Sequence, residues 1–196
     1  MTPTTKALYI WLMISIVSTL TCGLVFISVQ QSLRQGANDP QIQMAQDIAA
    51  KLSAGATVES VVPKESVDIE KSLAPFVTVA DENGQTVASS AMLDAVVPKV
   101  PSGVFDYVAS HGEDRVTWQP RAGVRQAIVV TSYDSGSSKG FVVAGRSLKE
   151  VEKRTNQAWQ ESVAAWCAVV GVSLIMLLIG AAVLQRNKSH HAAHHA

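Results

Sequence analysis

The stretch FVTVADENGQTVASS at residues 76–90 has runs of β-branched and small side chains on both sides of Asn83-Gly84. An Asn-Gly pair between two runs of strand-forming residues is the strongest short-range signal of a β-hairpin. We therefore expect one strand over residues 76–81 and an antiparallel partner over residues 85–90. These two strands begin the sheet around which the middle of the chain should fold.

Three further runs rich in β-branched and aromatic residues predict three more strands, over residues 115–119, 124–133 and 140–145. The Gly- and Ser-rich residues 135–138 join the last two strands into a second hairpin. Between the hairpins we expect a proline-containing loop and then a short helix over residues 104–110, closed near Gly112. Residues 55–72 combine a proline with many charges and predict a loop that can include a short helix.

A helix is expected before the sheet. Four apolar residues recur there at helical spacing: Ile42, Ala45, Ala49 and Leu52. Gly36 and Pro40 should interrupt any helix that arrives from upstream, and Asp39-Pro40 has the pattern of a capped helix start. This helix should therefore cover residues 40–53.

A second helix is expected after the sheet. Ser147 and Glu150 have the spacing of a capping box, in which two reciprocal hydrogen bonds start a helix. Residues 147–170 contain no glycine and no proline. The helix should therefore continue unbroken into the apolar segment that follows, and a stiff helix of this kind can transmit force or position.

Two apolar segments frame this central part. Residues 7–29 and residues 162–184 each provide 23 residues without a charge, and about 20 helical residues cross the core of a bilayer. A buried helix of a soluble protein is the alternative, but such helices rarely stay apolar on all sides over this length. The first segment exceeds the apolar region of a signal peptide and lacks a clear cleavage site, so we expect an uncleaved anchor.

The charges predict how the chain is oriented in the membrane. Residues 30–161 hold all 16 acidic residues and 13 basic ones, a net charge of −3, whereas the two tails hold three cations and no acid. Short basic tails stay in the cytoplasm. We therefore expect a bacterial inner-membrane protein with cytoplasmic termini at residues 1–6 and 185–196, and with residues 30–161 in the periplasm or outside the cell.

Small residues in the two predicted spans suggest helix contacts within the membrane. Cys22 and Cys167, the only cysteines, sit at similar depth and either touch or pack as two small apolar residues. Ala164, Ala168 and Gly171 lie nearly in line on the second span, which permits close approach of another helix. We therefore expect a homodimer or a contact with a membrane protein partner.

Together these elements predict an α+β fold in which two transmembrane helices flank a five-stranded antiparallel sheet with a long N-terminal helix on one face. With residues 76–90, the motifs RQAIVV at 125–130 and GFVVAGRS at 140–147 make the central domain resemble the PAS-like single Cache domains of bacterial chemoreceptors and sensor kinases. The resemblance implies a pocket between the sheet and its flanking loops that binds a small organic ligand.

The chain departs from that family in two respects. Only 12 residues, 185–196, follow the second span, where the family carries a kinase, a cyclase or a chemotaxis module. The constellation of Arg, Tyr, Trp and Asp that marks amino-acid-binding members is not recognisable. The resemblance therefore implies sensing or docking without an output module of its own.

The residues best suited to a ligand gather on two adjacent predicted strands and their turn: Arg125, Trp118, Tyr133, Arg121 and Arg115. Arginine offers a planar fork that clamps a carboxylate, while Trp and Tyr form apolar walls with polar tips. Arg125 and Tyr133 have the same parity on a strand and should share a face. We expect Arg125 to clamp a small organic anion with Trp118 as a wall; a solvated sheet face with cation–π contacts to Trp118 is the alternative.

No pattern predicts catalysis, a cofactor or a nucleic-acid partner. The sequence lacks a phosphate-binding loop, a dinucleotide glycine pattern, paired cysteine ligands and a nucleophile elbow. The only histidine of residues 30–161 is His111, and nothing pairs it with a serine and an aspartate. Four tail histidines have the i, i+4 spacing of a metal site on a helix, although a disordered tail or a tag remnant is the simpler explanation: His190, His191, His194 and His195.

Two functions from different classes remain open. The first is a ligand-sensing domain, anchored in the bilayer, that passes its state to a partner protein. The second is a small accessory subunit that docks its domain in a larger membrane assembly without a ligand. A closed pocket with convergent arginines would favour sensing, and an exposed apolar face without a cavity would favour docking.

Overall fold

The computed structural model describes the backbone of residues 3–193 and the side chains of residues 4–36 and 39–183. The chain divides into two compact units. One unit, Ser32–Arg154, holds the β-sheet. The other unit comprises Met1–Gln31 and Thr155–Ala196, and its described residues, 3–31 and 155–193, are helical.

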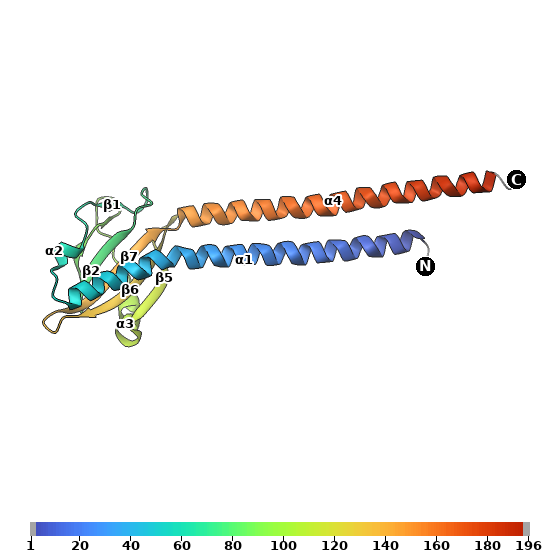
Figure 1. Ribbon diagram of the computed structural model, residues 1–196. Coiled ribbons are helices and arrows are strands. Elements are labelled where there is room, and N and C mark those ends of the chain that lie inside the picture. Colours follow the sequence, from blue (N-terminus) through green and yellow to red (C-terminus); the bar gives the residue numbers. More distant parts are fainter. Residues whose placement is uncertain (1–2, 194–196) are drawn as a thin grey trace. The chain divides into compact units, whose positions relative to one another are not determined.

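The sheet has five strands, each antiparallel to its neighbours, in the order β3-β2-β7-β6-β5 (Figure 1). The strands are β2 (Phe76–Asp81), β3 (Thr86–Ser89), β5 (Glu113–Arg121), β6 (Val124–Asp134) and β7 (Lys139–Ser147). The five predicted strands are confirmed, with ends that differ by a few residues. The central strand β7 pairs with both β2 and β6 and so joins the two predicted hairpins into one sheet.

The turn at Asn83-Gly84 closes the first hairpin, as predicted. Gly84 has a φ of +72°, which glycine adopts without a β-carbon clash. The carboxylate of Asp81 fixes the same turn, since it accepts hydrogen bonds from the backbone N–H groups of Asn83 at 2.9 Å and Gln85 at 2.8 Å. The sequence signal for this hairpin is therefore local, and it lies in the turn residues.

Helix α1 (Pro3–Ser53) covers one side of the sheet with its last turns. Of the predicted apolar stripe, Ala45, Ala49 and Leu52 are at most 7 % exposed. They pack on the side of the sheet that we call the helix face, made up of Val77, Val79, Val129, Tyr133, Val142 and Ala144. Most of these side chains are small, so the helix lies close to the strands.

Short elements and loops cover the opposite side, which we call the loop face: Phe76, Ala80, Trp118, Val124, Ile128, Val130, Phe141 and Val143. The covering elements are β1 (Val67–Asp68), β4 (Ala91–Met92) and α3 (Ser102–His111), and α2 (Val58–Val61) lies in the chain between α1 and β1. Helix α3 ends at His111 and is capped by Gly112, close to the prediction. The parallel pair β1–β4 was not predicted, because two-residue strands have no periodicity to detect.

The predicted break at Gly36 and Pro40 is wrong: α1 continues through both residues, and Asp39 does not start a new helix. A proline inside a helix removes one hydrogen bond and costs about 3 kcal/mol. Two separate helices would instead leave the backbone groups of two additional helix ends without intrahelical partners. One continuous helix is therefore compatible with the proline.

The start of helix α4 (Lys149–Ala193) differs from the expected capping box. The Ser147 hydroxyl accepts a hydrogen bond from the backbone N–H of Lys149 at 3.3 Å, two residues on rather than three. The Glu150 carboxylate accepts a hydrogen bond from Arg154 instead of from the helix start. The predicted continuity of this helix into the apolar segment is confirmed.

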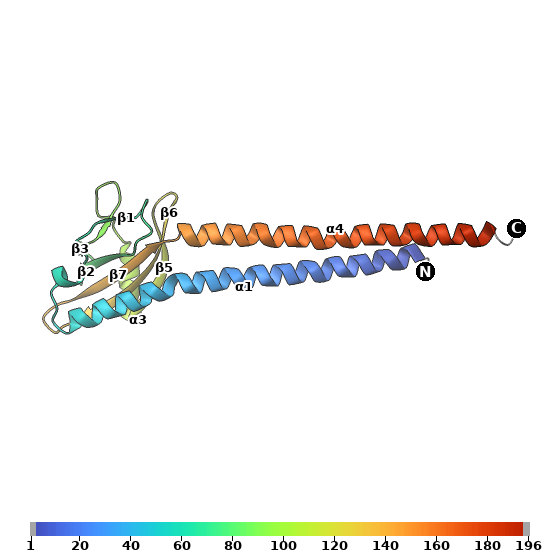
Figure 2. The same ribbon diagram turned by 45° about the horizontal axis from the view of Figure 1, so that its top comes forward.

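In the second unit, the segments of α1 and α4 lie side by side in opposite directions (Figure 2). Three contacts connect them: Trp166 Nε1 donates to Thr19 Oγ1 at 2.8 Å, Trp11 Nε1 donates to the Val170 carbonyl at 3.3 Å, and the Phe26 ring packs edge-on against Trp159 at 5.2 Å between centroids. Both cysteines are free thiols, Cys167 on the exposed side of α4 and Cys22 partly buried.

Both long helices contain a window that is long and apolar enough to cross a membrane. No residue of either window is buried inside the protein. The core helix of a soluble protein would be mostly buried. We therefore treat the two helices as candidate membrane spans that precede and follow the sheet domain along the chain.

Candidate functional site

Two of the predicted ligand-binding arginines are already paired with carboxylates of the chain. Arg115 Nε donates to Glu113 at 2.7 Å, and Arg125 Nη1 donates to Glu152 at 2.6 Å. Exposed pairs of this kind contribute only about 0–1 kcal/mol to stability. They nevertheless engage part of each guanidinium that a ligand would use.

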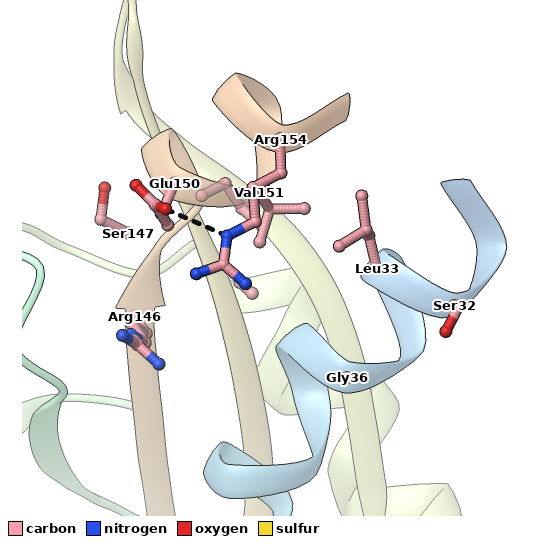
Figure 3. Close-up of a pocket in the computed structure, with 10 residues that line it drawn as sticks. Ser32, Leu33, Gly36, Arg146, Ser147, Glu150, Val151 and Arg154 are labelled. Carbon is pink, nitrogen blue, oxygen red and sulfur yellow. Dashed lines mark hydrogen bonds and ion pairs between the residues drawn. The ribbon is translucent and has the colours of Figure 1, made fainter. Parts of the chain in front are cut away.

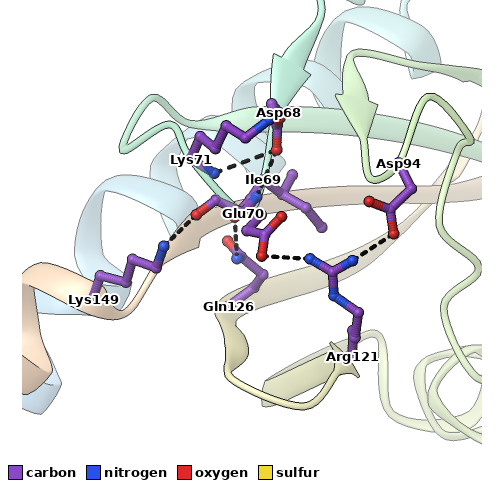
Figure 4. A network of polar contacts seen from close by, with 8 residues as sticks. All are labelled: Asp68, Ile69, Glu70, Lys71, Asp94, Arg121, Gln126 and Lys149. Atoms are coloured by element: carbon purple, nitrogen blue, oxygen red, sulfur yellow. Dashed lines mark hydrogen bonds and ion pairs between the residues drawn. The ribbon is translucent and has the colours of Figure 1, made fainter.

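Arg121 is the centre of a polar network beside the loop face (Figure 4). Its guanidinium contacts the carboxylates of Glu70 and Asp94, the latter at 2.6 Å. The hydrogen bond to Glu70 is the largest of the effects that raise the pKa of Arg121 above its ordinary value. The Lys149 ammonium donates to the backbone carbonyl of Glu70. The loop before β2 is thereby connected to both β5 and the first residue of α4.

Trp118 and Tyr133 are core residues, each 6 % exposed, on opposite faces of the sheet. Trp118 packs against Phe76 on the loop face, with ring centroids 6.4 Å apart. The register of β6 puts Arg125 and Tyr133 on one side of the sheet, as predicted, but eight residues, or roughly 26 Å of strand, separate them. The five residues therefore do not line one cavity, and their role in ligand binding stays a prediction.

A cavity of about 230 Å³ lies between α1, the ends of β6 and β7, and the first turns of α4 (Figure 3). We call it the arginine cavity, and its principal lining residues are Leu33 and Gly36 of α1, Ala127 of β6, Arg146 of β7, and Glu150 and Arg154 of α4. All of them belong to the sheet-containing unit. Gly36 has no neighbouring atom within 4 Å of the position of a β-carbon, which keeps this wall open.

Two guanidinium groups and one carboxylate set the charge of the arginine cavity. Arg146 Nε donates to the Leu73 carbonyl at 3.1 Å, and Arg154 Nε donates to Glu150 at 3.0 Å. The terminal nitrogens of Arg146 have no hydrogen-bond or ion-pair partner among the described side chains and backbone groups. With one carboxylate against two guanidinium groups, the cavity carries a formal charge of +1 and can accept a small anion.

Sequence reasoning missed Arg146 and Arg154. Arg146 has the same parity on β7 as Val142 and Ala144 of the helix face, and this alternation could have shown that it points toward α1. Arg154 follows Glu150 by four residues, which is a common helix pair. Neither signal indicates a cavity, because the cavity depends on α1 continuing past Gly36.

The other polar groups are less suited to binding a ligand or to catalysis. A second cavity of about 420 Å³, beside the turn at Asn83-Gly84, has Lys99 as its one charged lining residue. The ring of His111 is exposed; its Nδ1 lies 2.8 Å from the Ser110 hydroxyl and 3.0 Å from the Tyr107 carbonyl, and no described carboxylate forms a hydrogen bond or ion pair with it.

No group of three His, Cys, Asp or Glu side chains that could hold a metal occurs in the described part of the chain. The predicted metal-binding tail falls outside that part: the side chains of His190 and His191 are not described, and neither are His194 and His195. Comparison with protein-family models finds no match. Comparison with curated proteins also finds none.

Proposed function

We propose that this protein is a membrane-anchored, sensor-like domain that binds a small anion and passes its bound state to a partner protein. The observation that carries the proposal is the arginine cavity, whose walls come from α1, the sheet and the start of α4. An anion held by Arg146 and Arg154 would connect β7 with α4, beside the wall that α1 forms at Leu33 and Gly36. Binding would therefore stabilise one position of α4, and α4 is continuous with a candidate span.

The proposed arrangement has both termini in the cytoplasm and the sheet domain in the periplasm or outside the cell. The charge count supports it, since basic tails without acids flank an acidic central part. Protease added to spheroplasts should cut within residues 30–161 and leave both tails intact. Digestion of a tail from the outside would contradict this topology.

The resemblance to PAS-like Cache domains supports a sensing role as part of the same proposal. A five-stranded antiparallel sheet with a long N-terminal helix on one face agrees with what that resemblance implies. A signalling partner, or a second copy of the chain, would pack on the second span, where Ala164 and Ala168 are exposed. Replacing both alanines with leucine should weaken crosslinking of the chain in membranes, and unchanged crosslinking would count against this contact.

Thermal unfolding of the full chain in zwitterionic detergent, measured against a panel of carboxylates, amino acids and phosphate esters, tests the anion site. An anion at 100 times its Kd stabilises the native state by about 2.7 kcal/mol, which should raise the midpoint by roughly 10 °C for a domain of this size. Arg146→Gln should remove most of this shift.

Lys64→Gln is the control for that measurement, because Lys64 is an exposed cation that does not line the arginine cavity. It should keep the full shift. A panel without any shift would contradict the anion site. A shift that survives Arg146→Gln but disappears in Arg125→Gln would restore Arg125 as the principal clamp.

The size of the arginine cavity favours one alternative, a docking subunit without a ligand. Its volume of about 230 Å³ lies below the roughly 300–1,000 Å³ of pockets for drug-sized molecules. A partner that copurifies from native membranes, combined with no response to any anion, would favour this second function.

A further inference from the structure

In the proposed topology, the position of the arginine cavity along the chain places it next to the membrane surface. Leu33 of its wall follows Val29, the last residue of the first predicted span, by four residues. Four residues span at most about 14 Å even when fully extended, and about 6 Å in a helix. The headgroup layer on each side of a bilayer is about 5–8 Å thick. One wall of the cavity therefore lies within reach of lipid headgroups, whatever the tilt of the helices.

The chemistry of the cavity matches a phosphodiester. Such a group carries one negative charge, equal and opposite to the formal charge that Arg146, Arg154 and Glu150 give the cavity together. Its two non-bridging oxygens fit the planar fork of a guanidinium. Leu33, Leu148 and Val151 supply apolar walls beside these groups, which suits the glycerol that adjoins a lipid phosphate.

The small volume of the cavity distinguishes a lipid from a free organic ligand. A space of about 230 Å³ is sufficient for a phosphate and its neighbouring atoms, but it lies below the roughly 300–1,000 Å³ of pockets for drug-sized molecules. A lipid needs to place only its headgroup there, because the acyl chains stay in the bilayer. A headgroup tethered to the surface also has a high effective concentration, so one pair of arginines is sufficient for occupancy.

We propose that the arginine cavity binds the phosphate headgroup of an anionic phospholipid from the leaflet next to the sheet domain. This inference rests on the proposed function, since it names the class of anion that the same site takes. An occupied cavity would connect α1 and α4 through the lipid. The domain would then respond to the anionic lipid content of its own membrane.

The test is binding of short-chain phosphatidylglycerol to the full chain in zwitterionic detergent, measured by native mass spectrometry against short-chain phosphatidylcholine. We expect preferential binding of phosphatidylglycerol. Arg146→Gln and Arg154→Gln should each weaken it about tenfold or more, as expected for the loss of a charged hydrogen bond. Lys64→Gln, at an exposed lysine that does not line the arginine cavity, should bind like the unmodified chain.

Parallel titration with glycerol phosphate and the carboxylate panel separates the two proposals. Binding of these soluble anions at Arg146, with no preference for phosphatidylglycerol, would overturn the lipid inference and leave the anion-sensing function intact. No binding of any anion would overturn both. Phosphatidylglycerol binding that Arg146→Gln and Arg154→Gln leave unchanged would overturn the site assignment.

Discussion

The two faces of the sheet bury their residues in different ways. On the loop face, the aromatic rings of Phe76, Phe105, Trp118 and Phe141 fill the space under short elements and loops. On the helix face, small side chains such as Ala45 and Ala144 allow one helix to pack directly on the strands. Large side chains fill the gaps beneath the short elements and loops. A straight helix, by contrast, diverges from a twisted sheet along its length.

This difference locates the cavity. A helix that crosses a twisted sheet is close to the strands over a few turns and then separates from them. The arginine cavity lies where α1, at Leu33 and Gly36, is beyond the packed region of Ala45 to Leu52. The predicted ligand site included Trp118, which lies on the loop face. The aromatic side chains of that face pack into the hydrophobic core instead.

Removal of the Trp118 side chain should give the largest effect. Trp118→Ala should cost about 3–5 kcal/mol of stability, the usual loss when a buried aromatic side chain is truncated. Trp118→Phe keeps a ring against Phe76 and should cost clearly less. Native-state hydrogen exchange of the β6 amides in the full chain measures both. A loss below about 1 kcal/mol for Trp118→Ala would suit the wall of an open ligand site and contradict a filled face.

Two alanines on the same side of the sheet should respond differently to enlargement. Ala144 is fully buried under α1, so Ala144→Leu should cost about 1–3 kcal/mol through overpacking. Ala127 lines the arginine cavity, so Ala127→Leu should change stability by less than about 1 kcal/mol while abolishing anion binding. The same exchange experiment and the anion panel provide the two measurements. Equal destabilisation by both changes would mean that the cavity is packed in solution.

A small effect is expected where α1 meets the edge strand β5. Burial raises the pKa of Glu113, but hydrogen bonds from Arg115 and from Gln46 of α1 outweigh it and lower the pKa below 4.5. A lowered pKa stabilises the fold above the unfolded-state pKa, and this stability is lost as the pH falls through the folded-state pKa.

Glu113→Gln should therefore reduce stability at neutral pH by up to about 1 kcal/mol and make the loss of stability below pH 4.5 less steep. Unfolding midpoints recorded from neutral to acidic pH provide the comparison. Glu65→Gln, in the exposed loop before β1, is the control. An unchanged acid profile for Glu113→Gln would show that the contact with α1 does not contribute.

The sheet could be predicted from the sequence because its signals are local. Asn83-Gly84 determines the first hairpin, and alternation over residues 124–133 and 140–145 defines two strands of the second. The end of α1 followed from its apolar stripe. The predicted helix break at Gly36 and Pro40 was wrong because it relied on the local helix-breaking preference of glycine and proline. The continuation of α1 through both residues decided the outcome instead.

The site was harder to predict because it depends on distant contacts. Arg125 and Trp118 are neighbours in the predicted strands, yet the strand register directs them to opposite faces. Arg146 and Arg154 are brought together with Leu33 only by the packing of three elements. Alternation along a strand assigns each side chain to one face of the sheet, but it cannot show whether other residues cover that face.

The most direct test of the central claim is hydrogen exchange of the full chain, with and without the anion that raises the melting midpoint most. Added anion should slow exchange in residues 146–154 and leave residues 113–121 of β5 unchanged. Arg146→Gln should remove the protection. Protection of the segment that contains Trp118, or no protection anywhere, would contradict an anion site in the arginine cavity.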